Sequence, residues 1–333
     1  MRAWLSHTAG GPEALKLEEV ADPSPSAGQL LVRIFAVGMN YPDALLIRDQ
    51  YQVKAPRPFA PGAEFSGVVE EVGPGAKHFA PGDLVIGRCG WGGLAEKIAI
   101  DEERCVHLPA GMSPIDAASF LFVYATAYHA LRDVARLRGG ETMLVLGAAG
   151  GVGSAAIEIG RALGARVVAA ASSKLKLDYA LARGATNGVV YPSTVDEPAS
   201  QRELSQSFKD IVGAEGADIV FDPVGGPYSE AALRTLRPGG RHLVVGFAGG
   251  IPRLPLNLVL LKRCQVLGVD WRGFLLQNPA DNDANIESLV ALWREGLIRP
   301  DVHASFAFEE APQAIETVER RQAMGKIVVR VSA

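Results

Sequence analysis

The sequence has little of what metal sites and disulfide frameworks are built from. Among its 333 residues are six histidines and three cysteines, and the cysteines stand singly at Cys89, Cys105 and Cys264. Structural zinc takes about four closely spaced Cys or His ligands and catalytic zinc about three, and neither spacing occurs here. Single scattered cysteines are typical of reduced thiols in an intracellular protein. We therefore expect no metal site, no disulfide framework and a cytoplasmic location.

Long apolar runs and a large charge of one sign are also missing. No stretch is long and apolar enough to cross a bilayer, and the first residues lack the regions of a signal peptide. The formal net charge of −4 gives no attraction to nucleic acid or to an anionic membrane. No serine stands in a G-x-S-x-G elbow after a strand, which disfavours serine hydrolysis. We expect an enzyme that acts on a small molecule, without a nucleic-acid or membrane partner.

What the sequence does contain is a strand, a glycine-rich turn, a helix and a second strand. An apolar run over 143–146 predicts a buried strand, 152–163 a helix and 166–171 another strand. Such glycines let the backbone approach a pyrophosphate, and the helix N-terminus offers it free N–H groups. A tight turn that needs glycine for structure alone is the alternative. We predict a dinucleotide site at Gly147, Gly150, Gly151, Val152 and Gly153.

The residues after the second of these strands favour NADP over NAD. An NAD site usually has an acidic residue there to hold the ribose 2′-OH. This chain has Ser172, Ser173, Lys174 and Lys176 instead, and no acid. Hydroxyl and ammonium groups suit a 2′-phosphate. The alternative is that the two lysines only form the solvated start of a helix.

The hydrophobic pattern indicates an α/β protein with two modules. Residues 1–110 contain short strands between Pro/Gly turns, which predicts a β-rich barrel or sandwich. From 142 to 271 strands alternate with helices, which predicts a doubly wound parallel sheet. Ligands of such sheets bind at the carboxyl ends of the strands. Possible cofactor neighbours at these ends are Ser172, Tyr191, Pro223–Gly225 and Phe247–Gly249.

Polar residues for chemistry gather between residues 40 and 51. Asp43 and Tyr51 are candidate proton donors or orienting groups. For both, a purely structural role is the alternative. Asp43, for example, follows Pro42 and could cap a helix. A quinone acceptor could take its protons from water, so hydride transfer would need mainly position and a dry pocket.

The assembled motifs resemble the zinc-free quinone oxidoreductases, zeta-crystallin-like members of the medium-chain dehydrogenase/reductase superfamily. The resemblance implies a GroES-like catalytic domain from residues 1–122 and 271–333 around a Rossmann NADP-binding domain, residues 123–270. It also implies bound NADPH and a homodimer formed through the edge of the Rossmann sheet. The motifs that carry it are Asn40-Tyr41-Pro42-Asp43, Pro61-Gly62-Ala63-Glu64-Phe65-Ser66-Gly67, Gly147-Ala148-Ala149-Gly150-Gly151-Val152-Gly153 and Gly325-Lys326-Ile327-Val328-Val329.

Several site residues follow from this resemblance. It implies that Ser172, Lys176 and Tyr191 hold the NADP phosphate. It implies that Thr126 lies near the nicotinamide and that Asn40 lines the active site. The zinc-dependent members have a His-Glu pair and a four-cysteine lobe, whereas this chain has Ala63-Glu64 and a lobe without those cysteines. These departures argue against alcohol dehydrogenase chemistry.

We therefore expect an NADPH-dependent quinone oxidoreductase, with a cleft lined by Asn40, Asp43, Tyr51 and Thr126 and with Phe247 near the cofactor. Two alternatives stay open. One is an enone or enoyl-thioester reductase, because Tyr51 matches the tyrosine proposed as proton donor in related enoyl-thioester reductases. The other is an NADPH-binding protein with little turnover, crystallin-like or nucleic-acid-binding, and the charge of −4 argues against nucleic acid.

Overall fold

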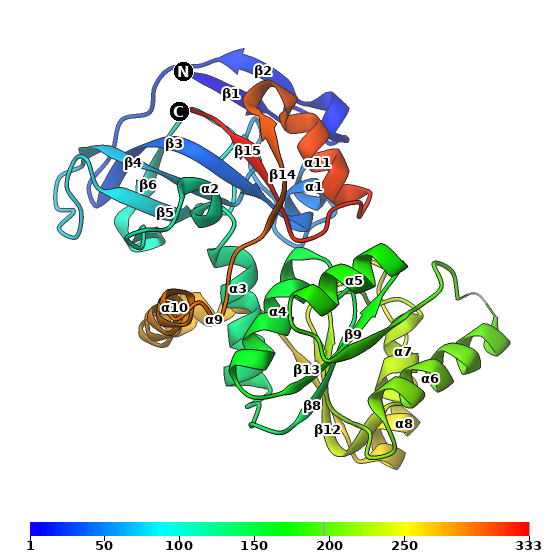
Figure 1. Ribbon diagram of the computed structural model, residues 1–333. Helices are drawn as coiled ribbons and strands as arrows, with labels where there is room; N and C mark the ends of the chain where they lie inside the picture. The colour runs from blue at the N-terminus through cyan, green and yellow to red at the C-terminus, as the bar shows by residue number, and fades with distance from the viewer. Residues whose placement is uncertain (196, 333) are drawn as a thin grey trace. The chain divides into compact units, whose positions relative to one another are not determined.

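The computed structural model describes residues 1–195 and 197–332, which form two compact units. One unit is built from both ends of the chain, Met1–Phe122 and Pro300–Ala333, and the other is Val123–Arg299. Both are drawn in Figure 1, the second in green to orange. No helix among the described residues is long and apolar enough to cross a membrane.

The first unit is centred on a seven-stranded, mostly antiparallel sheet with the order β14-β15-β3-β4-β5-β7, in which β6 also pairs with β3. Among the described strands of this sheet, only the β14–β15 pair is parallel, and β1 and β2 form a separate antiparallel pair. The long central strand β3 is almost entirely buried because it pairs with three neighbours. The strands are β1 Arg2–Leu5, β2 Lys16–Glu19, β3 Gln29–Met39, β4 Glu64–Val72, β5 Leu84–Arg88, β6 Lys97–Asp101, β7 Cys105–His107, β14 Val302–Ala307 and β15 Lys326–Arg330.

Short helices complete the first unit. Helix α1 begins after Asn40 and packs against α11. Asp43, which the sequence offered as a helix cap, accepts the N–H of Asn40 in this first turn. Helix α2 begins after Ser113, whose hydroxyl caps the helix by accepting the N–H of Asp116. The helices are η1 Pro12–Ala14, α1 Tyr41–Ile47, η2 Glu102–Arg104, α2 Pro114–Ala117, η4 Phe308–Glu310 and α11 Ala311–Glu319.

The second unit contains a six-stranded parallel sheet with the order β10-β9-β8-β11-β12-β13. This is the strand order of a Rossmann fold. The strands all run parallel, and it is their order along the chain that reverses between the neighbours β8 and β11. The prediction of a doubly wound parallel sheet is confirmed. Its strands are β8 Thr142–Val145, β9 Arg166–Ala171, β10 Asn187–Val190, β11 Ala217–Asp222, β12 Leu236–Val244 and β13 Gln265–Gly268.

Helices connect these strands. Helix α3 runs across the boundary between the units and continues as a π-helix. The helices are α3 Leu121–Tyr128, the π-helix η3 His129–Val134, α4 Gly151–Ala162, α5 Lys174–Ala182, α6 Pro198–Val212, α7 Tyr228–Leu233, α8 Leu256–Lys262, α9 Trp271–Gln277 and α10 Pro279–Arg294. Helix α7 ends at Leu233, and the chain enters β12 at Leu236, which is paired with Ala217 of β11.

The end of the second unit differs from the expected domain boundary. The sequence assigned residues 271–333 to the GroES-like domain, whereas residues up to Arg299 belong to the second unit. Contacts within this unit explain the difference. Asn285 of α10 donates to Asp133 at 2.8 Å, and the N–H of Arg299 donates to Glu158 of α4 at 3.1 Å.

Candidate functional site

The glycine-rich turn lies between β8 and α4, at the carboxyl end of β8. Gly147 has φ +56°, a conformation that favours glycine, and Gly150 is the N-cap of α4. A Cβ atom on Gly153 would overlap the carbonyl oxygen of Gly147, so the turn and the helix can pack this closely only with glycine. The first turn of a helix leaves its N–H groups without intrahelical partners. Those of Gly151 and Val152 are therefore suited to a pyrophosphate.

The candidate residues for a 2′-phosphate come from two neighbouring strands. Ser172 follows β9 and is exposed, and Tyr191 follows β10 and is buried. Because β9 and β10 are parallel neighbours, the N–H of Tyr191 donates to the carbonyl of Ala171 at 2.9 Å. The structure thereby brings Ser172 and Tyr191 to one edge of the sheet. Half-buried Lys176 lies in the first turn of α5, close to them in sequence and on the adjoining helix.

Two other polar residues at this edge have structural contacts. The hydroxyl of Ser173 caps α5 by accepting the N–H of Lys176. The ammonium group of Lys174 pairs with Asp178 one turn along the same helix. In this structure, Ser173 and Lys174 thus serve the start of α5 itself.

The remaining predicted cofactor neighbours lie in α3 and after β12. Thr126 is half-buried in α3. Phe247 follows β12 in a loop and keeps 49% of its surface exposed. This loop also contacts the turn after β11, where the N–H of Gly249 donates to the carbonyl of Val224 at 2.5 Å. Phe247 therefore belongs to a pair of joined turns at the carboxyl ends of the central strands.

In the first unit, the predicted residues Asn40 and Asp43 belong to a buried network that includes Lys326. The ammonium group of Lys326 donates to the carbonyl of Met39 at 2.9 Å, to Asn40 Oδ1 at 2.6 Å and to Glu64 Oε1 at 2.8 Å. Lys326 and Glu64 are almost fully buried. Removing one partner of such a pair leaves an uncompensated buried charge, at a cost of about 3–5 kcal/mol.

Asn40 and Glu64 are further tied to the backbone. Asn40 Nδ2 donates to Glu64 Oε1 at 3.0 Å and to the carbonyl of Gly38 at 3.1 Å. The N–H of Phe122 donates to Glu64 Oε2 at 2.9 Å. Both ends of the Asn40 amide are thus engaged inside the unit, and the network fixes the strand end that precedes α1.

Asp43 holds the backbone around this network. Its carboxylate accepts the N–H of Asn40 at 2.7 Å and that of Gly62 at 3.2 Å. Burial raises the pKa of Asp43 to about 7, against the opposing effects of these hydrogen bonds and of nearby Lys326. Tyr51 lies half-buried against the apolar core of the same unit. The structure brings Asn40 and Asp43 together, with Asp43 turned toward the backbone.

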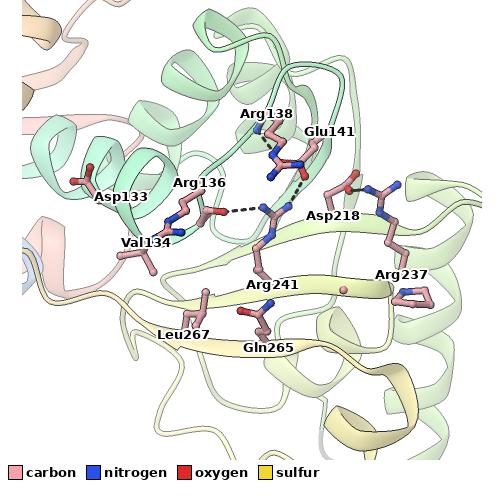
Figure 2. A pocket seen from close by; sticks show the side chains of 13 residues that line it. Asp133, Val134, Arg136, Arg138, Glu141, Asp218, Arg237, Arg241, Gln265 and Leu267 are labelled. Carbon is pink, nitrogen blue, oxygen red and sulfur yellow. Dashed lines mark hydrogen bonds and ion pairs between the residues drawn. The ribbon is translucent and has the colours of Figure 1, made fainter.

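The second unit also has a cavity at the other end of its sheet (Figure 2). It measures about 590 Å³ and lies where β8, β11, β12 and β13 begin. Arg241 donates to the carbonyl of Ala135 at 2.7 Å and to Glu141 at 2.6 Å, and Arg237 pairs with Asp218. None of the predicted site residues lines this cavity. It is separate from the glycine-rich turn, which lies at the carboxyl ends of the strands.

Comparison with known proteins establishes the family. Residues 26–110 match the family model described as alcohol dehydrogenase GroES-like domain, and residues 151–288 match the model described as zinc-binding dehydrogenase. Quinone oxidoreductase-like protein 2 of Rattus norvegicus is 35% identical over 343 residues, which cover 98% of this chain and 96% of that protein. The chain belongs to the medium-chain dehydrogenase/reductase superfamily. Its relatives include quinone oxidoreductase-like proteins, as the sequence motifs predict.

Solved structures of this superfamily confirm the two-domain α/β fold. The quinone oxidoreductase of Thermus thermophilus, also solved in complex with NADPH, is 35% identical, with a TM-score of 0.82 over 99% of this chain and 100% of that one. The Escherichia coli quinone oxidoreductase complexed with NADPH is 26% identical, with a TM-score of 0.89 over 99% of this chain and 100% of that one. The GroES-like and Rossmann assignments are confirmed.

One of the two family models is described as a zinc-binding dehydrogenase, but the residues of this medium-chain reductase are not suited to bind zinc. Both carboxylate oxygens of Glu64 are occupied by Lys326, Asn40 and a backbone N–H. Burial raises the pKa of the Cys89 thiol, and the nearby Asp43 charge raises it further, so this thiol stays protonated. Within 1–195 and 197–332, no three or more His, Cys, Asp or Glu side chains gather as a metal would require.

Sequence reasoning did not assign roles to Glu64 and Lys326. Both stand in motifs that identified the superfamily, but nothing local shows that they meet, because 262 residues separate them. The available signal was a lysine at the head of the apolar run Ile327–Val329, which forms a buried strand. A charge at the start of a buried strand requires a partner.

Proposed function

We propose that this medium-chain reductase is an NADPH-dependent quinone oxidoreductase that works without a metal. Bound NADPH would supply a hydride with its two electrons from C4 of the nicotinamide to the quinone, and water would supply the proton that completes the hydroquinone. The observation that carries the proposal is the edge formed by β9 and β10. It combines Ser172, Lys176 and Tyr191 and has no acidic residue directly after β9.

Each group of residues has a distinct part in this proposal. The N–H groups at the start of α4, with Gly147, Gly150 and Gly153, would hold the pyrophosphate. Ser172 and Lys176 would bind the 2′-phosphate, with the Tyr191 ring beside them, because hydroxyl and ammonium groups pair with phosphate oxygens. Of the remaining candidates, Thr126 and Phe247 would lie near the cofactor.

The first unit would contribute the acceptor side. Asn40 and Tyr51 would contact the nicotinamide or the acceptor, and Asp43 would position Asn40 through the backbone bond that it accepts. Lys326 and Glu64 would hold the Asn40 amide in one orientation. We further propose that the enzyme is a cytoplasmic homodimer.

The test is NADPH oxidation against a small panel of acceptors, with NADH as the control cofactor. The panel contains 1,4-benzoquinone, 9,10-phenanthrenequinone, an alkyl enone and crotonyl-CoA. We expect turnover of the quinones with NADPH, little with NADH and little with the enoyl substrates. Faster reduction of the enone or of crotonyl-CoA would replace the quinone activity with an enone or enoyl-thioester reductase activity. Tight NADPH binding without turnover would indicate a binding protein instead.

A further inference from the structure

The carboxylate of Asp222, the last residue of β11, is held by two buried side chains. His242 of β12 lies with its Nε2 3.1 Å from Asp222 Oδ2. The hydroxyl of Ser229 in α7 donates to the same oxygen. His242 and Ser229 are fully buried and Asp222 nearly so. Residues from three consecutive elements therefore converge on one carboxylate oxygen.

The other oxygen of Asp222 organises the turn that follows β11. Asp222 Oδ1 accepts the N–H of Val224 at 2.9 Å and that of Gly225 at 2.8 Å. Burial would raise the pKa of Asp222, but the hydrogen bonds from His242, Gly225 and Ser229 outweigh it, and the pKa lies below its ordinary value. Asp222 is therefore a carboxylate whose two oxygens both accept hydrogen bonds.

This turn contacts the glycine-rich turn. A Cβ atom on Gly147 would lie 2.9 Å from Val224 Cγ2 and 3.6 Å from the Pro223 ring, so the side chains of the turn cover Gly147 closely. The turn is also bonded to the loop of Phe247, since the N–H of Gly226 donates to the carbonyl of Gly250 at 2.7 Å. A shift of Asp222 would move both turns relative to the start of α4.

Packing alone does not explain a histidine at position 242. Nδ1 of His242 is buried and has no hydrogen-bond partner among the described residues. An unsatisfied buried polar atom costs about 1–3 kcal/mol, so an apolar side chain would suit this position better if it served only the core. Within residues 1–195 and 197–332, the hydrogen bond of the imidazole is to Asp222 alone.

We propose that His242 is a positioning residue for dinucleotide binding. With Ser229, it holds Asp222 so that the turn 223–226 and the loop of Phe247 stay packed beside Gly147. His242 itself touches no cofactor in this role and acts only through Asp222. The inference rests on the proposed function, because it assigns the glycine-rich turn to NADPH.

The test compares His242→Leu with His242→Gln in the full chain. Glutamine places an amide N–H close to the position of the imidazole Nε2–H, whereas leucine removes the donor. We expect His242→Leu to raise the Kd for NADPH about tenfold, with a smaller change in kcat for quinone reduction. His242→Gln should restore most of the affinity. The Kd is measured by calorimetry and the stability by urea unfolding.

Leu243→Ala is the matched control. Leu243 is the next residue of β12, is fully buried and, because side chains alternate along a strand, lies on the opposite face. It should lower the free energy of unfolding while leaving the Kd for NADPH unchanged. An equal loss of affinity in Leu243→Ala and His242→Leu, or no rescue by His242→Gln, would overturn the role of His242.

A second variant keeps the proposal testable if His242→Leu does not fold. Ser229→Ala removes the other donor to Asp222 Oδ2 and should weaken NADPH binding about threefold. Unchanged affinity would overturn the proposal. If the unaltered protein binds NADPH but reduces no quinone, the quinone activity fails, and weaker binding in these variants still supports the positioning role. No binding of NADPH to the unaltered protein would overturn both.

Discussion

At the scale of single residues, the proposal makes the preference for NADPH depend on one lysine of α5. Lys176 lies in the first turn of the helix that follows Ser172 and is half-buried. We expect Lys176→Ala to raise KM for NADPH about tenfold and to leave KM for NADH unchanged. The reason is that its ammonium group would pair with a phosphate that only NADPH carries. Steady-state kinetics with both cofactors measures the difference.

Lys174, two residues earlier, is the control for this prediction. Its ammonium group pairs with Asp178 and its side chain is 75% exposed, so the pair contributes little. Lys174→Ala should leave both KM values unchanged. If it matches Lys176→Ala, or if Lys176→Ala affects NADH as much as NADPH, Lys176 is not the residue that reads the phosphate.

At the scale of elements, the junction of β8 and α4 is set by close backbone packing. Alanine is favoured over glycine in a helix by about 1 kcal/mol, so propensity predicts that Gly153→Ala stabilises α4. The Cβ atom would instead overlap the backbone of Gly147. We expect the free energy of unfolding to fall by about 1–3 kcal/mol, the usual cost of overpacking, as measured by urea unfolding without cofactor.

Gly160→Ala in the same helix distinguishes the effect of helix propensity from the effect of steric overlap with the backbone. Its Cβ atom would meet chiefly the terminal methyl group of Met143, a flexible side chain that can rotate away. We expect its free energy of unfolding to stay the same or to rise. Equal destabilisation by Gly153→Ala and Gly160→Ala would contradict the special role of the Gly147 carbonyl.

At the scale of the whole molecule, the edge of the parallel sheet supports the proposed dimer. Strand β13 pairs with β12 alone among the described strands, and Val266 on it is 38% exposed. The neighbouring α8 exposes Leu256, Leu260 and Leu261, each by more than two thirds of its surface. Clustered exposed leucines beside an open strand edge are typical of an interface.

We expect Leu260→Asp to convert a dimer into a monomer, because burying an unpaired carboxylate in an apolar interface costs more free energy than the contact provides. Light scattering measures the change against the chain mass of 35.2 kDa. Leu175→Asp, at a residue of α5 that is 67% exposed, should keep the dimer. A monomeric unaltered protein, or a Leu260→Asp variant that stays dimeric, would rule out this interface.

The sequence by itself determined what depends on neighbouring residues. The doubly wound sheet follows from the alternation of apolar runs and helical periods, and the glycine-rich turn follows from its spacing. The prediction of a 2′-phosphate site after β9 was possible because these residues directly follow a predicted strand. The motifs were also sufficient to recognise the superfamily, whereas the boundary that they implied at residue 271 differs from the division of the structure at residue 300.

Tertiary structure decided what depends on residues far apart in the chain. Lys326 meets Glu64 across 262 residues and Asn40 across 286, so no local pattern shows that these groups share a buried network. His242 meets Asp222 only because β11 and β12 are neighbours, in a register that pairs Val220 with His242. Residues 271–299 lie with the second unit because of hydrogen bonds to Asp133 and Glu158. Local propensity determines which elements form, whereas the burial of charge and the register of strands depend on which elements meet.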